Sequence, residues 1–191
     1  MDKISIPTGK NPLMMPVVLI STISSERVKN FCSIAWVTKV NSTPPLIMCA
    51  IGPHKKTYRN ILETKAYGIN IPSRELIAAI DYCGLNSGSK VDKQDVFTTF
   101  EGSFSHVPLI ETCVVNIECE LWKVMETPKN HLVIGEIKRI HANKSILTDD
   151  AIDIAKYDPV LHSMAGENLY FAIGEKTDDA YQGRSLPEGG L

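Results

Sequence analysis

Short apolar runs, each ended by a polar or proline-containing turn, are the feature that most limits how this chain of 191 residues folds. Their length and their many β-branched residues are typical of strands. One further segment, 30–40, alternates between apolar and small polar residues, as expected of a strand with one face exposed to water or a ligand. The strands predicted in this way cover 16–23, 30–40, 46–51, 66–71, 113–124, 131–140 and 169–173.

Only two segments have convincing helical spacing. Tyr58, Ile61 and Leu62 follow Thr57, which is expected to cap a short helix over 57–64. A second apolar stripe runs from Leu76 to Cys83, between a capping Ser73 and a terminating Gly84. Many short strands with two helices predict a mainly β fold, a barrel with a few short helical excursions. We expect one domain over 1–174 and a C-terminal tail over 175–191.

Composition excludes several classes of protein. With 43% hydrophobic and 22% charged residues, the chain has enough apolar mass to avoid disorder. No apolar run approaches the roughly 18 residues of a membrane span, and no export signal is visible. The five cysteines include no C-x-x-C pair, so we expect reduced thiols in a cytoplasmic protein. A barrel that binds oligonucleotides remains an alternative, although it needs a basic groove with exposed aromatics, and the net charge is −2.

Common catalytic signatures are missing from the sequence. It contains no G-x-G-x-x-G dinucleotide fingerprint, no G-x-x-x-x-G-K-[ST] phosphate loop and no G-x-S-x-G nucleophile elbow. The five histidines are not at close metal-ligand spacing, so no metal site is expected.

One basic segment has the residues of an anion site. Lys55, Lys56 and Thr57 directly precede or begin the first predicted helix. A helix N-terminus offers unpaired N–H groups and partial positive charge, to which two lysines and a hydroxyl add. The segment therefore predicts a phosphate cradle. From these residues alone, a solvated basic turn before a surface helix is the competing interpretation.

Five ordered segments together resemble the flavin reductase-like family, the FMN-binding split β-barrels of the flavoredoxin type. The first two are the N-x-x-[ST]-x-A-W strand with its following P-P and the T-x-x-N-I start of a helix. The others match T-x-x-F-x-V-N-x-P, H-x-x-x-G-E-V and a closing Y-Y-x-x-G. In this chain the segments are 30–36 (NFCSIAW) with Pro44-Pro45, 57–61 (TYRNI), 64–72 (TKAYGINIP), 131–137 (HLVIGEI) and 170–174 (YFAIG).

The resemblance implies an FMN-binding split β-barrel, Greek-key-like, that passes electrons from NAD(P)H through flavin N5 to a second acceptor. It also implies a homodimer with flavin sites near the subunit interface. A non-enzymatic FMN electron carrier between redox proteins is the alternative. No catalytic side chain is required, because the flavin carries the chemistry. The residues that the resemblance places at the flavin are Asn30, Ser33, Ile34, Ala35, Trp36, Cys49, Ile51, Lys55, Lys56, Thr57, Tyr58 and Lys93, with His131 as a neighbour.

Four of these residues also have a structural interpretation. Trp36 fits a core anchor as well as a cofactor contact, and Cys49 fits an inert buried thiol. His131 fits a surface histidine after a turn, and Lys93 fits a solvated loop.

Overall fold

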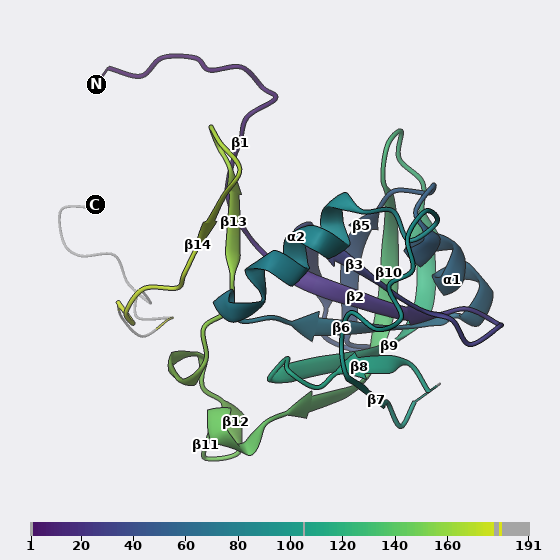
Figure 1. Ribbon diagram of the computed structural model, residues 1–191. Coiled ribbons are helices and arrows are strands. Elements are labelled where there is room, and N and C mark those ends of the chain that lie inside the picture. Colours follow the sequence, from purple (N-terminus) through teal and green to yellow (C-terminus); the bar gives the residue numbers. More distant parts are fainter. Residues whose placement is uncertain (1, 105, 178–179, 181–191) are drawn as a thin grey trace.

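The computed structural model describes residues 2–104, 106–177 and 180 (Figure 1). The helices are α1 (Lys56–Thr64) and α2 (Ile77–Leu85), with single 3-10 turns at Arg74–Leu76, Lys144–Ile146 and Ile154–Lys156. The strands are β1 (Asn11–Pro16), β2 (Val18–Ile23), β3 (Lys29–Ile34), β4 (Val37–Asn41), β5 (Leu46–Ile51), β6 (Ala66–Ile71), β7 (Thr99–Glu101), β8 (Pro108–Ile110), β9 (Val115–Met125), β10 (His131–Ala142), β11 (Leu147–Thr148), β12 (Ala151–Ile152), β13 (Leu161–Met164) and β14 (Leu169–Phe171).

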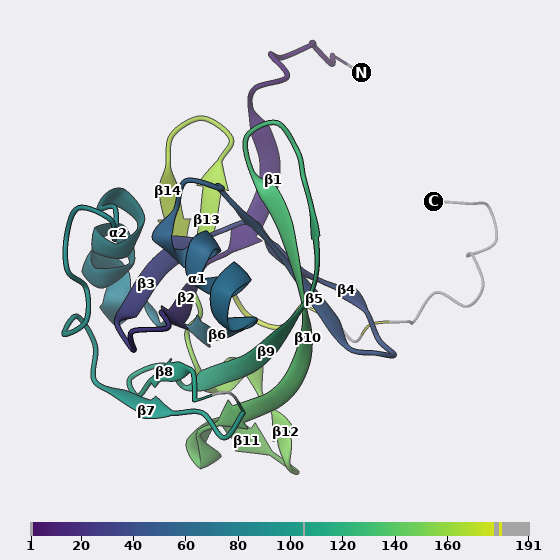
Figure 2. The ribbon, with the colours of Figure 1, turned by 90° about the vertical axis from the view of Figure 1, so that its right-hand side faces the viewer.

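A seven-stranded antiparallel sheet forms the body of the molecule, in the order β3-β2-β6-β9-β10-β5-β4. It curls around a core to which β2, β3, β5, β6, β9, β10 and helix α1 all contribute buried side chains (Figure 2). Ile20, Ile51, Ile61 and Ile69 are fully buried there. Helix α1 adds Ile61 and Tyr58 to this interior, which fixes its position beside strands β2 and β3.

The opposite face of β2 and β3 is covered by α2 and the loop that follows it. Phe31 from β3 meets Phe97 from that loop edge to face, with ring centroids 5.1 Å apart. Ile80 and Cys83 from α2 are buried in the same cluster. Because α2 packs here, its C-terminal end lies beside strand β3 and close to the start of α1.

Asn70 is the centre of a buried polar network that joins β6 to its neighbours. Its Nδ2 donates to Leu19 O and Ser21 Oγ, each at 2.9 Å. Its Oδ1 accepts from Ile110 N at 2.9 Å and Asn116 Nδ2 at 2.8 Å. A buried amide stabilises a fold only when its donors and acceptors are satisfied, and here both ends of the amide are.

A separate three-stranded sheet, in the order β1-β13-β14, stands beside the barrel (Figure 1). It joins a strand near the N-terminus to strands near the end of the described chain. The sheet reaches α2 through Tyr170, whose hydroxyl donates to Asp81 Oδ1 at 2.6 Å.

The structure confirms the mainly β fold and most of the predicted elements, and it corrects several details. Strands β1, β7, β8, β11, β12 and β13 were not predicted. Ser73 makes no capping hydrogen bond, and the N-cap residue of α2 is Leu76. The strand predicted over 30–40 breaks at Ala35 and Trp36, so β3 and β4 are separate strands and the predicted alternation of faces ends there. Thr57 does not cap α1: Lys55 is the N-cap residue, and the Thr57 hydroxyl accepts a hydrogen bond from Asn30 instead. Helix α2 ends at Leu85, so Gly84 lies inside it.

The tail predicted over 175–191 lies mostly outside the described residues. Neither α1 nor α2, each nine residues long, is long enough and apolar enough to cross a membrane, and the other described helices are single turns.

Candidate functional site

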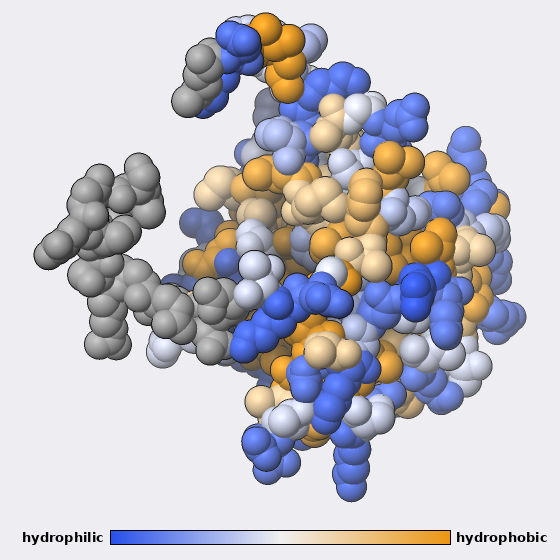
Figure 3. All heavy atoms as spheres, turned by 90° about the vertical axis from the view of Figure 1, so that its left-hand side faces the viewer, coloured by the Kyte–Doolittle hydropathy of each residue, from blue (hydrophilic) through white to orange (hydrophobic). Residues whose placement is uncertain are grey.

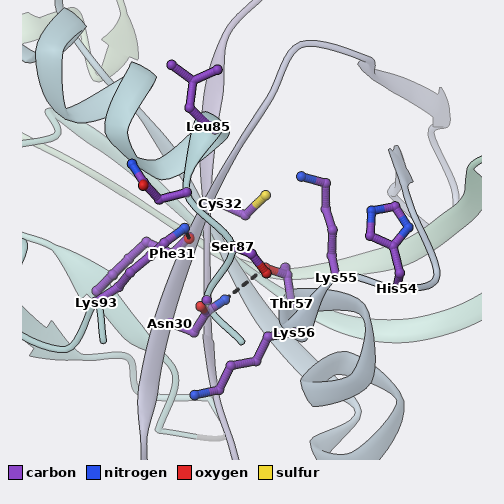
Figure 4. Close-up of a pocket in the computed structure, with 13 residues that line it drawn as sticks. Asn30, Phe31, Cys32, His54, Lys55, Lys56, Thr57, Leu85, Ser87 and Lys93 are labelled. Carbon is purple, nitrogen blue, oxygen red and sulfur yellow. Dashed lines mark hydrogen bonds between the residues drawn. The ribbon is translucent and has the colours of Figure 1, made fainter. Parts of the chain in front are cut away.

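A cavity of about 180 Å³ opens where β3, the start of α1 and the end of α2 meet (Figure 4). Five residues predicted from the sequence to bind the cofactor line it. Asn30 comes from β3, Lys55, Lys56 and Thr57 come from the α1 N-terminus, and Lys93 comes from the loop after α2. These segments are separated in sequence by about 20 to 40 residues and meet because α1 and α2 pack on the two faces of the same strand.

The floor of the cavity is hydrogen-bonded into a fixed arrangement. Asn30 Nδ2 donates to Thr57 Oγ1 at 2.9 Å, and both side chains are buried. Thr57 keeps its hydroxyl proton free to donate to a bound anion. A Cβ added at Gly88 would collide with Asn30 Oδ1, so the loop after α2 can approach the cavity this closely only with glycine at that position.

The positive end of α1 faces this cavity, and neither a capping side chain nor a carboxylate of the described residues neutralises it. No side chain caps the helix, and its first N–H groups have no partner within the helix. Within the described residues, no carboxylate lies within ion-pair distance of Lys55 or Lys56. Two unpaired ammonium groups, a hydroxyl and a helix N-terminus are the kinds of groups that can bind a dianion such as a phosphate.

Strand β3 adds free backbone groups to the same cavity. It is an edge strand, so alternate residues turn their backbone polar groups away from β2. The Phe31 carbonyl is one of these groups, because it accepts from Lys93 Nζ at 3.0 Å. The N–H groups of Phe31 and Ser33 share this direction, since backbone groups two residues apart in a strand point the same way.

Lys93 is buried and spans the two walls of the cavity. Its ammonium donates to Phe31 O at 3.0 Å and to Cys83 O at 2.9 Å, which leaves one N–H for a ligand. Burial lowers the pKa of this amine below its usual value. The solvated-loop interpretation of Lys93 is therefore wrong, because the side chain is a buried bridge between β3 and α2.

The remaining predicted residues lie outside this cavity. Ser33 lines a neighbouring cavity, and Ala35 and Trp36 form the break between β3 and β4, where Trp36 is 44% exposed. The structure places the other four in the barrel core, because their side chains point inward from β3, β5 and α1: Ile34, Cys49, Ile51 and Tyr58. Burial raises the pKa of the Cys49 thiol to about 12, which fits its interpretation as an inert packed side chain.

His131 lies at the start of β10 and is not among the residues that line the cavity. Its Nδ1 is hydrogen-bonded to the Tyr58 hydroxyl at 2.9 Å, and the two rings meet edge to face. Through Tyr58, His131 contacts helix α1 from the barrel side.

The sequence interpretation missed His54, which lies next to Lys55, and the second wall of the cavity, which is formed by residues 84–88 at the end of α2 and beyond. The Gly-Leu-Asn-Ser-Gly composition of 84–88 indicated only a loop. Among the described residues, no group of three or more histidine, cysteine or acidic side chains is arranged to hold a metal ion.

Comparison with known proteins identifies the family. A domain model described as "Flavin reductase like domain" matches residues 11–162. The chain belongs to the flavin reductase-like family. All five residues predicted from the sequence that line the cavity fall within the matched region.

Solved structures of family members have the same fold. The chain is similar to flavoredoxin from Methanosarcina acetivorans, with 31% identity and a TM-score of 0.90, covering 96% of this chain and 97% of that one. Flavoredoxin of Desulfovibrio vulgaris (Miyazaki F) is 30% identical, with a TM-score of 0.85 and coverage of 94% and 99%. A split-barrel protein from Shewanella frigidimarina shares the fold at 20% identity, with a TM-score of 0.77 and coverage of 88% and 86%. The predicted split-barrel fold class is thereby confirmed.

Proposed function

We propose that the protein binds FMN and passes electrons from NAD(P)H through flavin N5 to a second acceptor. The observation that carries this proposal is the cavity at the α1 N-terminus, in a chain of the flavin reductase-like family. A bound flavin supplies hydride acceptance at N5 and onward electron transfer, and the protein supplies position and electrostatics.

The phosphate end of FMN fits the residues at the start of α1. Lys55 and Lys56 neutralise the dianion, and the Thr57 hydroxyl and the free helix N–H groups donate to it. The cavity of about 180 Å³ is enough for this end of the molecule but not for all of FMN, so the ring system extends beyond it along β3.

The polar edge of the flavin ring fits the free edge of β3. The ring presents carbonyl oxygens and ring nitrogens, and the N–H groups of Phe31 and Ser33 and the third N–H of Lys93 are donors on that side. The positive charge of Lys93 also favours electron density on that edge of the ring. Donors at the β3 edge and at α1 match the two polar ends of the same ligand.

The two flavoredoxin relatives support a flavin-dependent redox role over an oligonucleotide-binding barrel. They leave two hypotheses for the electron donor. One is an NAD(P)H-dependent oxidoreductase, and the other is an FMN electron carrier that receives electrons from a redox protein.

Anaerobic titration of the FMN-loaded protein separates these two hypotheses. We expect NADH or NADPH to bleach the visible flavin absorption within the mixing time of a stopped-flow experiment. Bleaching by a reduced ferredoxin-type donor, with no response to either nicotinamide, would identify the carrier. A protein that retains no FMN after desalting and does not accelerate NAD(P)H oxidation with excess free FMN would contradict both hypotheses.

We also infer that the protein is a homodimer, with the β1-β13-β14 sheet in the interface. Leu13 and Met14 on β1 are 67% and 47% exposed, and Leu169 and Phe171 on β14 are each 46% exposed. Figure 3 shows apolar side chains gathered on the side of the molecule that carries this sheet. Exposed apolar side chains gathered on one side of a protein typically mark an interaction site.

Charges placed on this sheet should dissociate the dimer. We expect Leu13→Glu combined with Phe171→Glu to elute as a monomer in size-exclusion chromatography with light scattering, because each carboxylate would be buried without a partner. The matched control, Val40→Glu with Ile140→Glu, adds the same charges to exposed positions on the barrel and should remain dimeric. A monomeric wild-type protein, or an unchanged mass for the first variant, would contradict the inference.

A further inference from the structure

A second cavity, of about 420 Å³, lies between α2, strand β3 and the β13–β14 hairpin. In both ribbon views α2 is next to this hairpin (Figures 1 and 2). Its polar side chains come from all three elements. Ser33 is on β3, Asp81 is on α2, and His162, Asn168 and Tyr170 are on the hairpin or in its connecting turn.

The second cavity continues the first along strand β3. Gly84 and Leu85 line both cavities. A Cβ built at Gly84 would lie 3.5 Å from the Ser33 Cβ, so α2 and β3 are in close contact where the two cavities meet. A second substrate placed here would therefore lie next to a ring system that extends out of the first cavity along β3.

Asp81 and Tyr170 give the second cavity an acceptor-rich wall. The Tyr170 hydroxyl donates to Asp81 Oδ1 at 2.6 Å. Burial and the neighbouring carboxylate raise the pKa of Tyr170 to about 12, so the phenol keeps its proton and this hydrogen bond persists at neutral pH. Asp81 Oδ2 has no partner within the described part of the chain and remains free to accept from a ligand.

The other polar groups around this cavity are also without partners among the residues that the structure describes. The Ser33 hydroxyl, the Asn168 amide and the ring nitrogens of His162 make no hydrogen bond there. The His162 ring packs against the Tyr170 ring at 5.4 Å between centroids. Leu85 adds exposed apolar surface from α2, and the buried Ile80 lies behind the cavity wall. Apolar surface with a few unpaired polar groups is typical of a small-molecule site.

We propose that this second cavity binds the ring of the second substrate, and that Asp81 makes it select planar rings with an uncharged hydrogen-bond donor. A carboxamide or hydroxyl group can donate to the free oxygen of Asp81. The same ring with a carboxylate in that place is repelled by Asp81 and cannot donate to it. The inference rests on the proposed flavin function, because that function requires a second substrate beside the flavin.

Nicotinamide and nicotinate are suitable probes, since they differ only in the amide and carboxylate groups. Their dissociation constants are measured by ligand-observed NMR titration of the full chain, with and without FMN. We expect nicotinamide to bind at least ~10-fold more tightly than nicotinate, a difference typical of one charged hydrogen bond. Hydroquinone in a parallel titration tells whether a hydroxyl serves as well as an amide.

Substitutions of Asp81 and Asn168 test whether Asp81 is the group that makes the cavity prefer nicotinamide over nicotinate. Asp81→Asn should bring the two dissociation constants within ~3-fold, because it removes the repelling charge. Asp95→Asn, the matched control, removes a charge from an exposed position in the loop after α2 and should leave the ratio unchanged. Asn168→Asp adds a carboxylate to the wall at an exposed position and should increase the ratio, so the proposal is testable even if the Asp81 variant fails to fold.

Equal binding of nicotinate and nicotinamide by the wild-type protein would overturn the inference, as would an unchanged ratio in folded Asp81→Asn. FMN retention, measured on the same samples, reports on the proposed function separately. Selective nicotinamide binding by a protein that neither retains FMN nor accelerates NAD(P)H oxidation with free FMN would leave the selectivity of the cavity standing and contradict the flavin function. Retained FMN without selectivity would overturn the inference about the second cavity and leave the flavin function standing.

Discussion

Replacement of both Lys55 and Lys56 by alanine should weaken FMN binding by at least ~100-fold, since each charged hydrogen bond contributes about 1.5 to 3 kcal/mol. Both lysines line the first cavity, and no described carboxylate lies within ion-pair distance of either, so both charges are available to a phosphate. The measurement is a fluorescence titration with FMN at fixed ionic strength.

Riboflavin is the control ligand for this experiment, because it carries the same ring without the phosphate. We expect its affinity to change by less than ~3-fold in the same variant, because only the phosphate contacts are removed. Lys39→Ala with Lys129→Ala removes two exposed charges elsewhere and should leave FMN binding as in the wild type. If riboflavin loses as much affinity as FMN, the two lysines act on the fold or on the ring and not on a phosphate.

Asn70→Ala should lower the free energy of unfolding by about 3 to 5 kcal/mol, the largest effect on stability that we expect from one substitution. The substitution leaves buried groups on β2, β8 and β9 without their partner, among them the Ile110 N–H and the Asn116 amide. Urea unfolding without added flavin measures the change. The midpoint should fall while the dependence of free energy on urea concentration stays constant.

The matched control for this prediction is Asn41→Ala. Asn41 is exposed and makes one side-chain hydrogen bond, from Nδ2 to Pro44 O at 2.8 Å. Because water can replace that partner, we expect a change below about 1 kcal/mol. A similar loss for both variants would mean that the Asn70 network contributes no more than an ordinary surface contact.

Local patterns in the sequence were enough to predict the mainly β fold and the part of the candidate site at the start of α1. Strands β5 and β6 were predicted with their correct bounds, because their apolar runs end at polar residues or proline. Helix α1 was predicted to within one residue at its start. Lys55, Lys56 and Thr57 were predicted to lie together at a helix start, and the structure shows that they line one cavity. Their role as an anion site stays a prediction.

The same patterns failed where side-chain direction depends on packing. Cys49 and Ile51 are close in sequence to the basic segment, but the curl of the sheet turns them into the barrel core. Thr57 was predicted to cap the helix, but its hydroxyl instead accepts a hydrogen bond from Asn30 on β3. The break at Ala35 and Trp36 has no signal in the alternation of polar and apolar residues.

The sequence by itself determined both helices and, apart from the break between β3 and β4, the strands of the seven-stranded sheet, because these depend on residues only a few positions apart. The tertiary structure alone decided that the end of α2 and the loop to Gly88 form the second wall of the first cavity. It also decided that Ser33, Asp81 and Tyr170 share the second cavity. Contacts between such distant segments depend on how α2 and the β13–β14 hairpin pack on the sheet, and no local periodicity records that packing.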